Sequence, residues 1–179
     1  MVVRAAPAAK VADLDGLLRD EAAFRAWYDA TLPRVYGYLL LRTGRDHQVA
    51  EDLTQETFAE FVRSRHRYDG RTDLVPWIIG IARHRLADHY RRAERRQRSL
   101  LRFVTERERP QPIFERSGDP ILEALDALPP AQRAAVVLRY VDDLPVREVA
   151  RLLHRSESAT ESLLSRARDS LRRTGGLIR

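Results

Sequence analysis

Apolar residues recur along this chain at spacings of three and four, and no segment alternates at the period of a β-strand over more than a few residues. Spacings of three and four place side chains on one face of an α-helix. The pattern therefore predicts an all-α fold of about seven or eight helices. The first long helix covers about residues 21–42 and ends at Thr43-Gly44, with a break near Pro33, because proline lacks the amide hydrogen that a helical turn needs.

A second helix is predicted from about Asp46 to Ser64, and its two faces differ in chemistry. At about 100° per residue, one side carries Leu53, Thr54, Thr57, Phe58 and Phe61, and the opposite side carries Asp52, Gln55, Glu56 and Ala59. The first side is suited to packing in a core. The acidic side is either an ordinary solvated helix face or a docking patch for a basic partner.

A third helix is predicted from about Leu74 to Leu100, after a turn at residues 68–73 in which Thr72 or Asp73 supplies the N-cap oxygen. Its expected buried stripe consists of Val75, Ile79, Ala82, Leu86 and Ala93. The other side carries His84, Arg91, Arg95, Arg98 and Arg102, flanked by Arg85, Arg92 and Arg96. Trp77, near the start, is either a core anchor or an exposed ring on which an unstacked base could lie.

Positive charge is concentrated on this third helix. Residues 83–102 hold eight arginines and two acids, a net charge of +6, which equals the formal charge of the whole chain. Basic charge gathered on one element is typical of a phosphate-binding surface, because neutralising a polyanion releases its condensed counterions. Nucleic acid is therefore the first partner to expect, and we expect the arginines to form a continuous exposed surface.

The helical pattern fails between about Phe103 and Gly118, where prolines, a glycine and mixed charges have the composition of a flexible linker. A domain boundary is predicted there. Beyond it, a short helix stops at Pro129-Pro130, and another holds Val136, Val137 and Tyr140.

The last two predicted helices, from Pro145 to Leu153 and from Ser156 to about Arg173, are either a helix-turn-helix or an ordinary helical hairpin. In the second of them, Ala159, Leu163, Leu164, Ala167 and Leu171 point inward, leaving Ser158, Glu161, Ser162 and Ser165 outside. Small polar side chains let a helix approach base edges, and a carboxylate such as that of Glu161 can accept a hydrogen bond from cytosine N4. Phosphate contacts would come from the amides at the helix start and from Arg155, Arg166 and Arg172.

The composition, 44% hydrophobic and 32% charged, is typical of a globular protein. The absence of cysteine excludes disulfides and thiolate metal sites and favours a reducing compartment. The N-terminal segment lacks the apolar core of a signal peptide, and no apolar run approaches membrane-spanning length, so we expect a cytoplasmic protein without membrane insertion. The five histidines lack metal-site spacing, and no catalytic constellation or glycine-rich phosphate loop occurs. We therefore expect no enzyme activity, no metal and no cofactor.

Three segments together carry a family resemblance. AEDLTQETFAEFV at 50–62, PWIIGIARHRLADHYRR at 76–92 and the stretch from LPPAQRAAVVLRYVDDL to SRAR at 128–168 resemble the extracytoplasmic-function (ECF) group of bacterial RNA polymerase sigma factors. The resemblance covers almost everything from about Phe24 to Arg173. It implies two small helical domains, sigma region 2 at 21–100 and sigma region 4 at 120–174, joined by a linker at 101–119. Residues 1–20 are then an N-terminal extension, and residues 175–179 a C-terminal tail.

The resemblance also implies roles for individual residues. The second helix would dock on the beta-prime subunit of core RNA polymerase through Asp52, Gln55 and Glu56. The turn before the basic helix would capture a flipped base of the promoter −10 element through Arg71, Thr72 and Asp73. The helix after it would hold the −10 strand through Trp77, Arg83, His84, Arg85, Asp88, His89, Arg91 and Arg92. The final helix would contact the −35 element through Arg155, Ser156, Ser158, Ala159, Glu161, Ser162 and Arg166.

Further partners implied by the resemblance are the beta subunit of the polymerase, promoter DNA and an anti-sigma factor. Family members often carry a threonine and a basic residue early in the recognition helix, where this chain has Ala159 and Glu161. The difference predicts −35 contacts of another kind. The rival hypothesis is a stand-alone helix-turn-helix regulator, which would have no use for an acidic docking face on the second helix.

Overall fold

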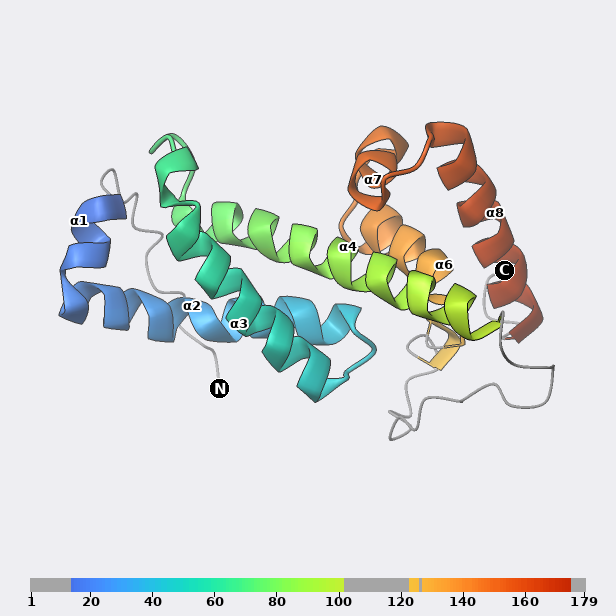
Figure 1. Ribbon diagram of the computed structural model, residues 1–179, viewed down its shortest axis with the longest axis horizontal. Helices are drawn as coiled ribbons and strands as arrows, with labels where there is room; N and C mark the ends of the chain where they lie inside the picture. Colours follow the sequence, from blue (N-terminus) through green and yellow to red (C-terminus); the bar gives the residue numbers. More distant parts are fainter. Residues whose placement is uncertain (1–13, 102–122, 126, 175–179) are drawn as a thin grey trace. The chain divides into compact units, whose positions relative to one another are not determined.

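The computed structural model describes residues 14–101, 123–125 and 127–174, and the predicted linker at 101–119 lies almost wholly outside them (Figure 1). The chain divides into two compact units, Met1–Leu86 and Ala87–Arg179, so that the division falls within one long helix. The α-helices are α1 (Leu14–Arg19), α2 (Glu21–Arg42), α3 (His47–Arg63), α4 (Leu74–Leu101), α6 (Pro130–Val136), α7 (Val146–Leu153) and α8 (Glu157–Thr174). A 3-10 turn at Arg65–Arg67 and a π-helical turn at Val137–Val141 complete the assigned elements. These described residues contain no strand, which confirms the all-α prediction.

Helix α2 begins and ends as predicted but continues through Pro33. Its N-cap is Asp20, whose Oδ1 accepts the amide of Ala23 at 3.0 Å, and its C-cap is Thr43, followed by Gly44 in the left-handed region at φ 71°. The expected break near Pro33 is therefore wrong. Pro33 and Asp29, whose carbonyl loses its amide partner, are both exposed, so water can hydrate that carbonyl without interruption of the helix.

Helix α3 packs beside α2 and buries the face that the sequence pattern assigned to the core. Asp46 caps its start, with Oδ1 accepting the amide of Val49 at 3.0 Å. The two buried threonines donate to backbone carbonyls one turn earlier, Thr54 to Ala50 and Thr57 to Leu53, each at 2.6 Å. The buried hydroxyls are thereby satisfied, and the apolar face closes around them.

An aromatic cluster joins α2, α3 and α4 in the first unit. Phe61, which is fully buried, stacks on Trp27 at 4.7 Å between ring centroids and lies 5.1 Å from the ring of Trp77. Tyr68 contacts the other side of the cluster, 5.1 Å from Trp77. Trp77 is half-buried, so it acts as a packing residue whose ring still reaches the surface next to the loop that precedes α4.

The buried stripe of α4 agrees with the predicted one at Ala82 and Leu86 and differs from it toward both ends of the helix. Its fully buried residues are Leu74, Ile78, Ala82, Leu86, Ala87 and Tyr90. Val75, Ile79 and Ala93 are only half-buried. The apolar residues at the start of the helix come in adjacent pairs, so two stripes about 100° apart fit the sequence equally well. The contacts with the aromatic cluster select between them.

In the second unit, α6 and α7 both pack against α8. The core of these helices includes Leu138, Val149, Leu163, Leu164 and Ala167. Between α7 and α8 the chain turns at His154, which adopts the left-handed conformation at φ 52°. Ser156 then caps α8, its Oγ accepting the amide of Ala159 at 3.1 Å. Two helices joined by so short a turn have the form predicted for residues 145–173.

Candidate functional site

The acidic face of α3 is open to solvent. Asp52, Gln55 and Glu56 are all exposed, on the side of the helix opposite the buried Leu53 and Phe58. Asp52 accepts a hydrogen bond from the side-chain amide of Gln48 at 3.2 Å, one turn earlier on the same side. The three predicted docking residues therefore lie together on a rigid helix whose other face is fixed in the core.

The loop between the 3-10 turn at Arg65–Arg67 and α4, residues 69–73, is held by side chains of Asp69 and of Tyr68 just before it. Asp69 Oδ1 accepts the backbone amide of Arg71 at 3.0 Å, and Gly70 between them has φ 70°, where glycine is unstrained. The hydroxyl of Tyr68 donates to the carbonyl of Thr72 at 2.5 Å. Burial, followed by the nearby carboxylates of Asp73 and Asp69, raises the pKa of Tyr68. A tyrosine hydroxyl is protonated at neutral pH even without such a shift, so it can donate here.

The three predicted base-capturing residues sit on this loop in two environments. Arg71 and Thr72 are exposed, whereas Asp73 is half-buried immediately before α4. The backbone carbonyl of Asp73 accepts the amide of Trp77 at 3.3 Å, but its side-chain Oδ1 is buried without a hydrogen-bond donor. Pro76, in the first turn, has no amide to offer that oxygen. The side-chain cap predicted for Asp73 is therefore not made by Oδ1.

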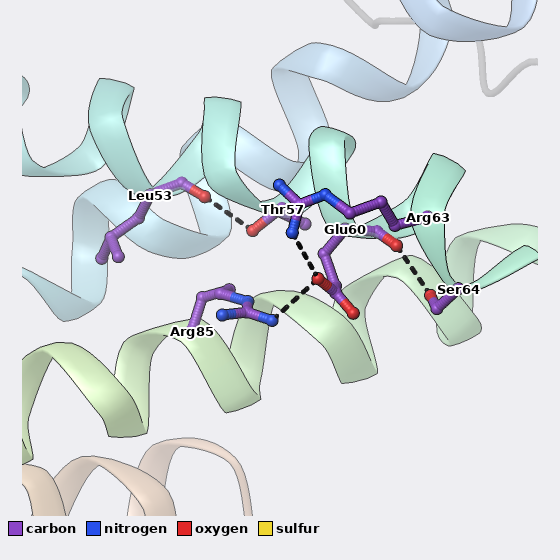
Figure 2. A network of polar contacts seen from close by, with 6 residues as sticks. All are labelled: Leu53, Thr57, Glu60, Arg63, Ser64 and Arg85. Atoms are coloured by element: carbon purple, nitrogen blue, oxygen red, sulfur yellow. Dashed lines mark hydrogen bonds and ion pairs between the residues drawn. The ribbon is translucent and has the colours of Figure 1, made fainter.

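The basic residues at 83–85 are not a uniformly exposed row. His84 is exposed, but Arg83 and Arg85 are half-buried. Figure 2 shows that Glu60 on α3 forms ion pairs with two arginines, and the N–O distances are 3.0 Å to Arg63 and 3.1 Å to Arg85. Arg85 thus ties α4 to α3 in the first unit. The expectation of a continuous exposed arginine surface is wrong at this position, because a carboxylate of the neighbouring helix already occupies the guanidinium.

The next turns of α4, in the second unit, also engage their basic residues. Arg91 forms an ion pair with Asp88 and donates to the backbone carbonyl of Leu152. Burial first, and then repulsion from Arg95 and Arg92, lowers the pKa of Arg91 from its ordinary value. Asp88, His89, Arg91 and Arg92 are each partly buried, while Arg95 and Arg96 are exposed. Asp88 therefore orients Arg91, a role that the sequence pattern did not indicate.

The outer face of α8 is polar, as predicted. Ser158, Glu161, Ser162 and Arg166 are exposed, and Ala159 is half-buried at the edge of that face. Arg166 Nε donates to the carbonyl of Ser162 at 3.3 Å. Arg155, expected to anchor a phosphate, forms an ion pair with Glu94 within the second unit. Ser158, Ser162 and Glu161 are thus exposed on this face together with Arg166.

The described residues offer neither a metal site nor a membrane span. No group of histidine, aspartate and glutamate side chains there is placed to hold a metal ion. None of the helices among these residues combines the length and the apolar character that a membrane span requires.

Comparison with known proteins decides the family. The sigma-70 region 2 model matches residues 27–96, and the sigma-70 region 4 model matches residues 118–171. The ECF RNA polymerase sigma factor SigX of Bacillus subtilis is 30% identical over 169 residues, which are 89% of this chain and 87% of SigX. This chain belongs to the ECF sigma factors. It is a promoter-recognising initiation factor. The region 4 match favours a helix-turn-helix over an ordinary hairpin, and the region 2 match beside it disfavours a stand-alone regulator.

Other relatives agree with this ECF sigma factor in sequence and fold. SigK of Mycobacterium tuberculosis is 33% identical over 173 residues, covering 89% of this chain and 90% of SigK. BldN of Streptomyces coelicolor is 35% identical over 159 residues, covering 84% of this chain but only 60% of BldN. Among solved structures, the sigma factor RpoE of Bartonella quintana, crystallised with the anti-sigma factor NepR, matches with a TM-score of 0.54 at 21% identity. That match covers 87% of this chain and 98% of RpoE and supports the fold.

Proposed function

We propose that this ECF sigma factor divides promoter recognition among three surfaces. The acidic face of α3 binds core RNA polymerase at its beta-prime subunit. The 69–73 loop and α4 hold the opened −10 element, and α8 contacts the −35 element. The observation that carries this proposal is the pairing, in one unit, of an exposed acidic helix face with a loop whose Arg71 and Thr72 side chains are held outward.

The physical demands of strand opening fit the loop and α4. Taking a base out of the stack costs a few kcal/mol, which a pocket for the base and a basic surface for the strand must offset. The loop offers the exposed side chains of Arg71 and Thr72, and the half-buried Trp77 follows them in the first turn of α4. The arginines of α4 follow directly in sequence. No covalent step is required of any of these groups.

The test of this function is reconstituted transcription. Core polymerase alone should give no promoter-specific run-off product from genomic fragments, and addition of the purified chain should give discrete products that begin at defined sites. Footprints upstream of those sites should then map the −10 and −35 contacts. Products that are equally abundant without the chain would contradict the proposal.

Contacts to the −35 element are predicted to depend on Glu161. Its exposed carboxylate lies on the outer face of α8, where it can accept a hydrogen bond from a cytosine amino group. Replacement Glu161→Ala should relax base preference at one −35 position, by up to about 1–3 kcal/mol of discrimination. Asp169→Ala, which removes the same charge two turns later on α8, is the matched control. A panel of promoter variants measures the preference, and an unchanged profile would exclude Glu161 from base recognition.

An inhibitory partner and a cytoplasmic location belong to the same proposal. RpoE is solved in complex with an anti-sigma factor, and we propose a partner of that class for this chain. The chain has no cysteine, so a thiol-based signal would have to be sensed by the partner. The polymerase that the chain would serve works in the cytoplasm.

A further inference from the structure

We propose that Tyr68 is the positioning residue of the −10 loop: it fixes residues 69–73 in the base-accepting conformation before DNA arrives. The inference deepens the proposed function and rests on it. Tyr68 lies outside the loop and outside the set of residues expected to touch DNA. It acts by holding the backbone from which Arg71, Thr72 and Asp73 project.

The side chain of Tyr68 contacts both the end of the loop and the helix that follows it. The Tyr68 hydroxyl spans the loop to the carbonyl of Thr72, four residues on. Its ring packs against Trp77 in the first turn of α4, with 5.1 Å between centroids. Tyr68, which directly precedes the loop, is therefore bonded to the end of the loop and packed against the helix that follows.

The two halves of the loop are held by different contacts. Asp69 fixes the amide of Arg71, and glycine at position 70 permits the reversal of the chain. These local contacts set the first half of the loop. In the second half, the hydroxyl of Tyr68 holds the carbonyl of Thr72, and the amide of Trp77 holds that of Asp73.

The hydrogen bond from Tyr68 holds the loop backbone and leaves side chains of the loop exposed. Arg71 and Thr72 have exposed side chains, whereas Asp73 is half-buried and its Oδ1 is shielded from solvent. A loop that already holds such groups in place loses less conformational freedom on binding a base than a loop that must first be ordered. Loss of the hydrogen bond from Tyr68 should therefore weaken capture of the flipped base and leave the other promoter contacts intact.

The experiment compares Tyr68→Phe with Tyr36→Phe in polymerase holoenzyme. Both variants remove one hydroxyl from the same unit, and that of Tyr36 is bonded to His47 Nδ1 at 2.7 Å, in contacts unrelated to the loop. The templates carry a pre-opened −10 region in which single nontemplate-strand positions are made abasic in turn. Affinity is measured for each template, together with the melting temperature of each variant and its affinity for core polymerase.

The wild-type holoenzyme should lose affinity when one base of the opened strand is missing. Tyr68→Phe should bind the intact template about 3- to 10-fold more weakly, as expected for loss of one hydrogen bond. Tyr68→Phe should also be less sensitive to the abasic site at that one position, while its affinity for core polymerase stays at the wild-type level. Tyr36→Phe should match the wild type in template affinity, abasic profile and polymerase affinity. Asp69→Ala, which removes the other loop contact, should change the abasic profile in the same direction.

Other outcomes overturn the inference, and they separate it from the proposed function. An abasic profile of Tyr68→Phe parallel to that of the wild type would show that Tyr68 does not position the loop, although the loop captures a base. Equal weakening of polymerase binding and of every template would assign Tyr68 a general structural role instead. A flat profile in the wild type itself would remove base capture by this loop and with it the −10 part of the proposed function.

Discussion

Replacement of Glu56 by arginine is expected to weaken binding of this ECF sigma factor to core polymerase by about 100-fold or more. Glu56 lies on the exposed face of α3 with Asp52 and Gln55, and a docked basic surface would take its carboxylate out of water. Reversal of one charge in a desolvated pair then leaves two positive groups in contact, which typically costs about 2–5 kcal/mol. The measurement is a titration of labelled variant with core polymerase.

The matched control for this prediction is Glu51→Arg. Glu51 is exposed on the same helix, but it lies about 140° around the helix from Glu56, and the replacement makes the same change in net charge. The control should bind core polymerase nearly as well as the wild type, and both variants should bind isolated DNA alike. Equal losses of polymerase affinity for the two variants would show that net charge, and not the acidic face, governs the association.

The features of α3 could be predicted because they depend on local sequence. Aspartate at position 46 caps the helix, and the apolar and acidic residues separate cleanly at the helical period, so only one arrangement satisfies the pattern. The roles of the acidic residues in binding remain predictions. The same local logic gave the bounds of α2 and α8 to within a residue or two. It failed at Pro33, where the cost of proline depends on whether water reaches the freed carbonyl.

The sequence was less informative about α4, because its partners lie elsewhere in the chain. Adjacent apolar pairs at its start left the buried stripe ambiguous by one position, and the contact of Phe61 with Trp77 shows how the start of the helix meets α3. Counting arginines predicted the charge of the helix correctly, but not which guanidinium is already engaged. Glu60, one helix earlier, holds Arg85.

Tyr68 shows a further limit of sequence patterns. The Asp69-Gly70 pair indicates a turn, and α4 is evident from its apolar residues. The bond that closes the loop, however, joins a side-chain hydroxyl to a backbone carbonyl, and every residue carries such a carbonyl. A tyrosine directly before an Asp-Gly turn and nine residues before a tryptophan was a weak signal. Only the folded backbone brings its hydroxyl to Thr72.

The ion pairs on α4 change what the arginines can be expected to contribute. A guanidinium that already has a carboxylate or carbonyl acceptor must exchange it, or share its donors, when a phosphate arrives. Asp88 and the Leu152 carbonyl engage guanidinium nitrogens of Arg91, whereas the positive charges of Arg95 and Arg92 repel it. A phosphate placed among these three arginines would relieve that repulsion. We therefore expect these arginines to bind a polyanion with a net gain in affinity, which replacing two of them together should reveal.

The double replacement Arg91→Ala with Arg92→Ala is expected to lower open-complex formation and to flatten its dependence on salt. Each phosphate neutralised on a single strand contributes a slope of about 0.7 in the plot of log affinity against log salt. Loss of two contacts should reduce the slope by about 1.4, which corresponds to roughly 10- to 30-fold weaker binding at 0.1 M salt. Open complexes counted by permanganate footprinting over a salt series provide the measurement.

Arg25→Ala with Arg34→Ala is the matched control, because it removes the same charge from exposed positions on α2. Circular dichroism of both double variants checks that loss of the Arg91 contacts has left the helices intact. If the salt slope of the α4 variant equals that of the control, general attraction between a basic protein and DNA accounts for the binding. The arginines of α4 would then be structural partners of Asp88 and Leu152, and the −10 strand would have to be held by the 69–73 loop and Trp77.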